Sequence, residues 1–282
     1  MNDHSVYINE LKWLSGQKSM RSHIEEVAPT SIVYTSGLLD FSSTDENYLD
    51  LHGDLNRALD WLLTEISQVD TSKVDEIVLA TSTLNLEGAE VSRLWEKLIS
   101  PERFPVLSNA VWCQGKGCNI LTYATGRAFA KTRASAGAVL IVCLEVHKEG
   151  ASRLSDYAFF SDAVAFLLVS SRPTGYEILA SDTLILVDSK KFAFNCRFAQ
   201  GSYLPGTRMH TLNTFPFLLS RKYQDIPEGL SYTPSPQVKV HHYALDPFID
   251  LVRDSDAGST SSLIHVESPP FHVDELRLRR LN

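Results

Sequence analysis

Two short segments that are almost entirely apolar, 138–144 and 162–170, constrain the fold of this chain more than any other feature. A strand has apolar side chains on both faces when both faces of its sheet are covered. Apolar residues recur at helical spacing over 54–67, 87–99 and 119–132, which predicts three amphipathic helices. Buried strands that alternate with helices predict an α/β fold, in which a parallel or mixed sheet has helices on both sides.

The second part of the chain has a different pattern. Eight of the twelve prolines lie beyond residue 200, which predicts an irregular, looped region. One strand–helix unit stands out there, an alternating strand over 238–242 and a helix over 246–252 that begins at an Asp-Pro pair. We therefore expect a first domain over 1–172 and a shorter second domain over 173–282. Other expected elements are a strand or hairpin over 176–187, a helix over 211–223, and closing strands over 262–266 and 276–281.

The charge balance excludes several classes of partner. The chain has 26 Lys and Arg residues against 34 Asp and Glu residues, a formal net charge of −8. Binding to nucleic acid or to an anionic membrane needs concentrated positive charge, and the sequence has no basic block. No apolar run is long enough to span a bilayer, and the polar N-terminus lacks the apolar segment of a secretion signal. We expect a cytoplasmic protein that binds neither nucleic acid nor membrane.

The four cysteines, Cys113, Cys118, Cys143 and Cys196, have no Cys-x-x-Cys spacing. That spacing is typical of structural zinc sites and of redox-active pairs. The histidines likewise show no spacing typical of metal ligands. The sequence therefore predicts free thiols in a reducing compartment, with no metal site and no permanently bound cofactor.

Cys118 is the strongest candidate for a reactive side chain. It follows the glycine-bracketed turn 115–117 after an expected strand, and the helix expected over 119–132 begins directly after it. The positive end of a helix dipole and the unpaired N–H groups there stabilise a thiolate. A strand-to-helix turn also presents a nucleophile at the mouth of a sheet. Taken alone, however, a single cysteine is more often a small apolar core residue than a nucleophile.

The residues around Cys118 resemble the nucleophile segment of ketoacyl-ACP synthase III-type enzymes. Residues 118–124 read Cys-Asn-Ile-Leu-Thr-Tyr-Ala, where that family typically has Cys-Ala-Gly-Phe-Thr-Tyr-Ala. Residues 78–83 resemble the family's strand and Thr/Ser turn, and residues 139–145 resemble the strand after the nucleophile helix. Residues 160–165, Phe-Ser-Asp-Ala-Val-Ala, resemble its Phe-Gly-Asp-Gly-Ala-Gly turn with the glycines replaced. The resemblance covers most of the first domain and resumes weakly near the end of the chain.

This resemblance implies the thiolase fold, in which two pseudo-symmetric α/β halves enclose the active site, here with a truncated second half. It implies that Cys118 takes an acyl group from coenzyme A or from the phosphopantetheine of an acyl carrier protein. In that family a His and an Asn from the second half promote decarboxylation of a malonyl carrier and carbon–carbon bond formation. The implied pathways are fatty acid or polyketide biosynthesis, including secondary metabolism. Asp162 is expected to hold its turn rather than to act in catalysis.

His241, at the end of the strand over 238–242, is the best match for the family's histidine, and His242 follows it. Successive strand residues point to opposite faces, so only one of the two can face the site. In an alternative alignment this strand is the Asn-bearing one, and then no catalytic His is left. No Asn-centred motif matches, and Ser-Pro-Pro-Phe at 268–271 replaces the family's late glycine-rich turn, which removes a backbone donor. Both histidines are equally well explained as ordinary strand-end residues.

Two hypotheses of different kinds follow. In the first, the chain is an acyltransferase or condensing enzyme with an acyl-Cys118 intermediate, and His241 is its base or hydrogen-bond donor. In the second, it is a catalytically degenerate subunit that pairs with an active ketosynthase homologue. Thiolase-fold proteins pair through the edge of the central sheet, so the resemblance implies a homodimer or such a heterodimer. Arg277, Arg279 and Arg280 could contact an acidic carrier protein or could lie along a solvated strand edge.

Overall fold

The computed structural model describes residues 4–27, 46–83, 88–149, 153, 158–185, 198, 203–212, 226–232, 240–254, 260–268 and 272–281. Cys196, residues 269–271 and nearly all of the helix expected over 211–223 lie outside the described residues. Among the residues that are described, no helix is both long enough and apolar enough to cross a membrane.

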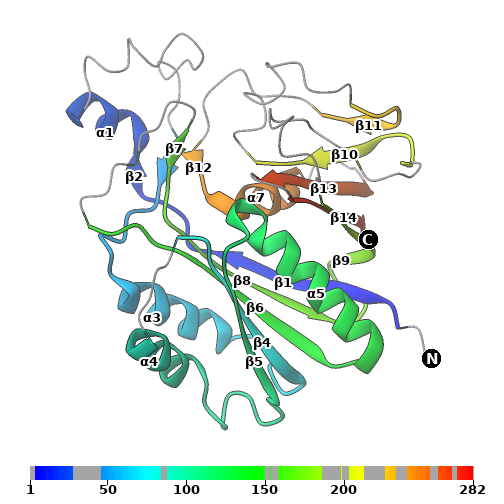
Figure 1. Cartoon of the computed structure of the whole chain (residues 1–282), viewed down its shortest axis with the longest axis horizontal. Coiled ribbons are helices and arrows are strands. Elements are labelled where there is room, and N and C mark those ends of the chain that lie inside the picture. Colours follow the sequence, from blue (N-terminus) through cyan, green and yellow to red (C-terminus); the bar gives the residue numbers. More distant parts are fainter. Residues whose placement is uncertain are drawn as a thin grey trace.

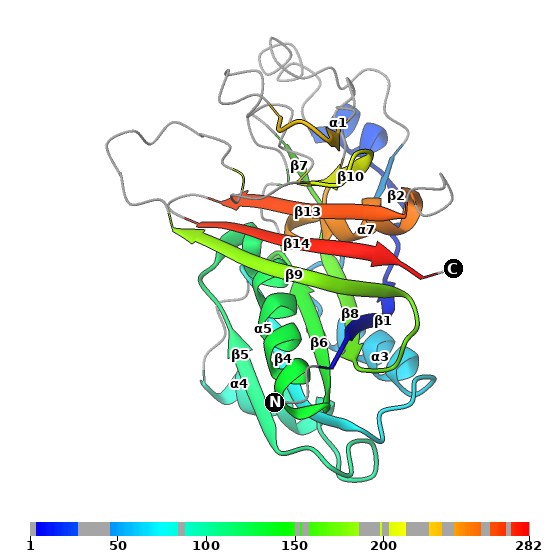
Figure 2. The same ribbon diagram turned by 90° about the vertical axis from the view of Figure 1, so that its right-hand side faces the viewer.

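A ten-stranded mixed sheet forms the centre of the molecule (Figure 1 and Figure 2). Its strands are β1 (Val6–Trp13), β4 (Val74–Ala80), β5 (Asn109–Cys113), β6 (Ala138–Glu145), β8 (Ala163–Ser170), β9 (Tyr176–Ile185), β10 (Thr207–His210), β11 (Leu230–Ser231), β13 (Ser261–Ser268) and β14 (His272–Arg280). Two small sheets accompany it: β2 (Lys18–Ser19) pairs with β3 (Asn47–Tyr48), and β7 (Phe159–Phe160) pairs with β12 (Val240–His241).

Within the described residues, four helices pack on the two faces of this sheet: α3 (Leu55–Ile66), α4 (Gly88–Leu98), α5 (Ile120–Ser135) and α7 (Asp246–Arg253). A further helix, α1 (Met20–Val27), packs against β2, and the described 3₁₀ turns are η1 (Gly117–Asn119) and η3 (Tyr243–Leu245). The Asp54 carboxylate caps α3 by accepting hydrogen bonds from the backbone N–H groups of Asn56 and Arg57. The three helices expected in the first half are therefore confirmed as α3, α4 and α5.

The sheet consists of two halves with the same topology. The first half has the order β5-β4-β6-β8-β1 and the second half the order β11-β10-β13-β14-β9. In both halves the first three strands of that order are parallel, and the fourth is antiparallel to both of its neighbours. Strands β1 and β9 pair antiparallel where the halves meet. This repeated order is the pseudo-symmetry that the family resemblance implied.

The apolar segments that predicted the fold are β6 and β8, and every residue of β6 is buried. Two strands of the second half are short, since β10 has 4 residues and β11 has 2. Two strands that the sequence did not predict, β10 and β11, precede the unit formed by β12 and α7, and α7 is the one α-helix in the described part of the second half, so the single strand–helix unit stays a prediction. Strands this short leave no periodic pattern in a sequence. The expected division at residue 172 falls between β8 and β9, and the two domains stay a prediction.

Two apolar cores lie on opposite faces of the sheet. The inner core joins α5 and α7 to strands of both halves, and the outer core joins α3 and α4 to strands of the first half. Figure 1 shows α5 crossing the face of the sheet with its N-terminal end beside α7. Because α5 packs against both halves, the turn that precedes it lies where the halves meet.

Candidate active site

Cys118 lies in the turn η1, between the edge strand β5 and the central helix α5. Gly115 and Gly117, on either side of Lys116, lead into Cys118 with positive φ angles of 78° and 54°, which glycine adopts without strain. Cys118 is half-buried, and its side chain packs at the boundary of the inner core. The structure therefore places the cysteine at the start of the helix, as the sequence predicted.

His241 approaches Cys118 from the second half of the molecule. The His241 Nε2 atom lies 3.6 Å from the Cys118 Sγ atom, which is within hydrogen-bond range for sulfur. The two turns that carry these residues also meet, because η1 packs against η3, which follows His241 by one residue. Of the two adjacent histidines, His241 is the one beside the sulfur and is 2% exposed.

Asp246 completes a row of three side chains. Its Oδ2 atom makes a very short contact with His241 Nδ1, and its Oδ1 atom accepts a hydrogen bond of 2.7 Å from the backbone N–H of His242. Asp246 is the first residue of α7 and is buried. The row Cys118–His241–Asp246 has the connectivity of a catalytic triad, in which a carboxylate orients an imidazole beside a nucleophile.

The electrostatics of this row favour a protonated imidazole. Burial alone would lower the pKa of His241, but the Asp246 carboxylate outweighs burial and raises that pKa to about 10. Burial would raise the pKa of Asp246, and the neighbouring His241 and His242 instead hold it well below its usual range. At neutral pH the sulfur of Cys118 therefore faces an imidazolium N–H.

The strand order shows which helices of the two halves correspond. In that order β10 is the counterpart of β4 and β11 is the counterpart of β5, so α7 is the counterpart of α5. His241 and Cys118 thus precede equivalent helices of the two halves. Under either alignment a histidine is left at the site, because His241 is in contact with the sulfur.

Sequence reasoning missed Asp246 as a member of the site. Its position before Pro247 was interpreted as a helix-start signal, and α7 does begin there. The side chain does not cap that helix but binds the imidazole of His241. The spacing of five residues between the His and the Asp was the only available signal, and no helix or strand period predicts such a contact.

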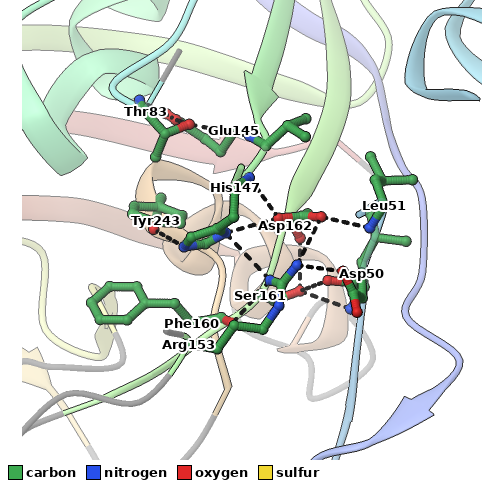
Figure 3. Close-up of polar contacts among 12 residues, drawn as sticks. Asp50, Leu51, Thr83, Glu145, His147, Arg153, Phe160, Ser161, Asp162 and Tyr243 are labelled. Carbon is green, nitrogen blue, oxygen red and sulfur yellow. Dashed lines mark hydrogen bonds and ion pairs between the residues drawn. The ribbon is translucent and has the colours of Figure 1, made fainter. Parts of the chain in front are cut away.

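A buried network of charged and aromatic side chains adjoins the triad (Figure 3). Asp162 is fully buried, and its Oδ1 atom accepts hydrogen bonds from the backbone N–H and from Nδ1 of His147, at 2.9 and 2.8 Å. The Asp162 Oδ2 atom accepts from Arg153 at 3.1 Å and from the Leu51 backbone N–H at 2.7 Å. Asp162 therefore binds His147, Arg153 and the backbone of Leu51 in addition to holding its own turn.

The network ends at Tyr243, whose hydroxyl is hydrogen-bonded to Nε2 of His147. The Tyr243 ring centroid lies 5.5 Å from the ring of His241 and 5.1 Å from the ring of Phe160. Tyr243 has a positive φ of 52°, a conformation that a bulky side chain rarely adopts. Such an outlier next to a nucleophile is a signal of function rather than of packing.

Glu145 is a second buried acid beside this network, as Figure 3 shows. Its carboxylate accepts hydrogen bonds of 2.8 to 3.0 Å from the backbone N–H groups and hydroxyls of Ser82 and Thr83. Burial outweighs these bonds and raises the pKa of Glu145 to about 7. Glu145 thus anchors the Thr/Ser turn after β4 to the end of β6.

Glu145 gives a testable pH dependence of stability. Because its pKa is raised in the folded state, its carboxyl favours the folded state when protonated and opposes folding once ionised. Its contribution is therefore lost as the pH rises from about 4.5 to about 7. The loss is at most about 3 kcal/mol, at 1.36 kcal/mol per pKa unit. Urea unfolding at pH 5 and pH 7.5 should show this slope in the wild type and a flatter one in Glu145→Gln. The exposed Glu149→Gln is the matched control, and an equal slope in all three proteins would contradict the assignment.

The remaining candidates lie away from the triad. Burial raises the pKa of the thiols of both Cys113 and Cys143. Arg277 and Arg279 form ion pairs with Asp182 and Glu177 across β14 and β9. The interpretation of these arginines as a strand edge was wrong, because β14 lies inside the sheet between β13 and β9.

Comparisons with known proteins bear on the fold. No family model matches the sequence, and no curated protein matches it in a sequence search. Solved structures do match over almost the whole chain. An acyltransferase, ChlB3, matches with a TM-score of 0.67 at 12% identity over 99% of this chain and 98% of its own. The 3-oxoacyl-(acyl carrier protein) synthase III of Pseudomonas aeruginosa matches with a TM-score of 0.62 at 14% identity over 98% of both chains. This chain has the thiolase fold.

A third structure, of HMG-CoA synthase complexed with CoA, matches with a TM-score of 0.67 at 14% identity, over 99% of this chain and 83% of its own. Identities this low establish a common architecture and do not transfer an activity. The function of this thiolase-fold chain therefore has to be argued from its own site.

Proposed function

We propose that this chain is an acyltransferase that forms a thioester between Cys118 and an acyl group delivered by coenzyme A or by the phosphopantetheine of an acyl carrier protein. The observation that carries the proposal is the row of Asp246, His241 and Cys118, assembled from both halves of the fold. A buried imidazolium beside a half-buried sulfur is the arrangement that activates a cysteine nucleophile. The structural neighbours include an acyltransferase and an enzyme solved with CoA, which agrees with this choice of donor.

In the first step the sulfur of Cys118 attacks the thioester carbonyl carbon of the acyl donor. The bond from that carbon to the carrier sulfur breaks, and the carrier leaves as a thiolate that takes a proton from the solvent, while His241 stays protonated. In the second step an acceptor attacks the acyl-Cys118 carbonyl, the carbon–sulfur bond breaks, and the acceptor gives its proton to the protein. Asp246 holds the imidazole in one orientation and tautomer throughout.

Transfer to an oxygen or nitrogen acceptor fits these residues better than carbon–carbon condensation. The family resemblance assigns decarboxylation to a His together with an Asn, and His241 has a carboxylate as its partner instead. The asparagine next to the nucleophile, Asn119, points its amide elsewhere. Its Nδ2 atom donates to the carbonyls of Val266 and His272 at 3.0 and 3.2 Å, and to Asp274 at 2.7 Å. Asn119 therefore joins the nucleophile turn to the β13–β14 hairpin and is not available to an enolate.

Intact mass spectrometry after incubation with an acyl-CoA tests the proposal directly. We expect one acyl adduct in the wild type and none in Cys118→Ala. Cys113→Ala is the matched control, because it removes a half-buried thiol five residues away and should keep the adduct. No adduct with any acyl-CoA or acyl carrier thioester would contradict the acyltransferase and favour the degenerate-subunit hypothesis.

The partner proposed for this chain is a second copy of itself. Strand β5 ends the sheet on one side, and its first two residues, Asn109 and Ala110, are exposed, so its backbone can pair with another edge strand. The alternative partner is a ketosynthase homologue on the same edge. Light scattering of the purified chain distinguishes the two: a dimer that Val111→Pro dissociates supports self-pairing, and a monomer contradicts it.

A further inference from the structure

We propose that Tyr243, His147 and Asp162 form a proton relay that serves the acyl acceptor, and that the acceptor is an alcohol or a primary amine. This inference rests on the proposed acyltransferase function and names the class of its second substrate. It concerns residues outside the triad, which itself accounts only for acylation of Cys118.

The hydrogen bonds fix the direction of the relay. The Nδ1 atom of His147 lies 2.8 Å from a carboxylate oxygen of Asp162 and 3.3 Å from Nη1 of Arg153, and the shorter contact places the proton on Nδ1. The Nε2 atom then accepts, and the Tyr243 hydroxyl donates to it. The phenol oxygen keeps lone pairs free to accept a hydrogen bond from an O–H or N–H group.

Nearby charges keep the Asp162 carboxylate ionised and the Tyr243 phenol neutral, as the relay requires. Arg153 donates to Asp162 at 3.1 Å and the Leu51 backbone N–H donates at 2.7 Å, which stabilises the carboxylate. Burial and the negative charges of Glu145 and Cys118 raise the pKa of the Tyr243 phenol above its ordinary value. Tyr243 is therefore a neutral hydroxyl that can pass on a proton, and the imidazolium formed on His147 would lie against Asp162.

The Tyr243 end of the relay lies beside the triad, where the acceptor has to bind. Tyr243 belongs to η3, which packs against the Cys118 turn η1, and its ring lies 5.5 Å from that of His241. Phe160 contacts both rings with centroid distances of 5.1 Å. Tyr243 keeps a positive φ of 52°, which tyrosine intrinsically disfavours. This is expected of a residue whose side chain has to point in one direction. His147 keeps 11% of its side chain exposed, whereas Asp162 is fully buried, so the polar chain runs from the interior toward solvent.

A relay supplies what the triad lacks in the second step. His241, paired with Asp246, is already protonated at neutral pH and so has no lone pair that could take the acceptor's proton. In the relay the acceptor O–H bond breaks, its proton goes to the Tyr243 oxygen, and the Tyr243 proton goes to Nε2 of His147. The acceptor oxygen bonds to the acyl carbon while the bond from that carbon to the Cys118 sulfur breaks. The proton on His147, which keeps 11% of its side chain exposed, then passes to the solvent and balances the proton that the carrier thiolate took up.

The test separates acylation from deacylation. Acyl-enzyme is prepared with acetyl-CoA, and its decay is followed by intact mass spectrometry with methanol or with hydroxylamine as the acceptor. Methanol needs a base, and hydroxylamine is nucleophilic enough to react without one. We expect Tyr243→Phe to form the adduct at the wild-type rate within about twofold and to slow decay in methanol by about 100-fold, the usual contribution of a general base. Decay in hydroxylamine should be unchanged.

Tyr203→Phe is the matched control, because Tyr203 also donates to a carboxylate that contacts a buried histidine, through Glu275 and His265 on the outer face. It should decay at the wild-type rate in both acceptors. An adduct in Tyr243→Phe that decays in methanol as fast as the wild type overturns the relay and leaves the acyltransferase intact. Absence of an adduct in the wild type overturns both.

Discussion

Replacing Asp246 by Asn is expected to slow acylation of Cys118 by about 10³- to 10⁴-fold at neutral pH, the loss found when a triad carboxylate is neutralised. The Asp246 carboxylate raises the pKa of His241 to about 10, against the effect of burial. Without that charge, burial makes the imidazole neutral at pH 7, and the charge that stabilises the sulfur anion is lost. An Asn side chain can also hold the ring in the other tautomer, with its lone pair turned from the sulfur.

Two measurements check this expectation. The rate of adduct formation with an acyl-CoA gives the catalytic loss, and alkylation of Cys118 by iodoacetamide between pH 6 and 10 reports the ion pair. In the wild type the protonated His241 persists until the pH approaches about 10, whereas in Asp246→Asn it should be absent over the whole range. Asp254→Asn is the control at the other end of α7, where the carboxylate pairs with Arg208 at 2.8 Å. If the acylation rate of Asp246→Asn were within threefold of the wild-type rate, the assignment of Asp246 to the site would be contradicted.

The fold was predictable because its strongest determinants are local. Strands β6 and β8 are apolar along their length, and α3 repeats its buried residues at helical spacing. The same reasoning failed for β10 and β11, whose 4 and 2 residues are held by pairing with neighbouring strands rather than by their own pattern. Tertiary pairing overrides local preference most easily in elements this short.

The site was only half predictable, for a related reason. The sequence identifies Cys118 as a candidate because glycines precede it and a helix follows it, and both features belong to one short segment. His241 and Asp246 lie more than 120 positions later, and only the folded chain shows that they meet the sulfur. The left-handed conformation of Tyr243 has no signature at all, because the residue type disfavours it. Functional positions that break local rules are the ones that sequence patterns miss.

Replacing Arg153 by Met is expected to cost about 3 to 5 kcal/mol of stability at pH 7, the usual cost of breaking a buried ion pair from one side. Arg153 is 6% exposed and is the cation that Asp50 and Asp162 share, at 2.7 and 3.1 Å. Burial would raise the pKa of Asp162, and the hydrogen bonds from His147 and Arg153 hold it below its ordinary value. Methionine fills much of the same volume and leaves two carboxylates without that partner.

The pH dependence distinguishes a lost charge from lost packing. A carboxyl with a lowered folded pKa stabilises the fold above its ordinary pKa, near 3.8, and loses that contribution as the pH falls further. The deficit of Arg153→Met should therefore be largest at neutral pH and should shrink below about pH 4, whereas a packing defect would persist. Arg172→Met, at an exposed arginine, should change stability by less than about 0.5 kcal/mol and is the control.

The same substitution links this network to catalysis. The Nη1 atom of Arg153 donates to the carbonyl of Phe160 at 3.3 Å, and the backbone N–H of the next residue, Ser161, donates to the carbonyl of His241 at 3.0 Å. Phe160 and His241 also pair directly where β7 meets β12. Arg153→Met should therefore slow acylation of Cys118 even at a temperature where the variant is fully folded. A folded variant with the wild-type acylation rate would show that the network stabilises the fold without positioning His241.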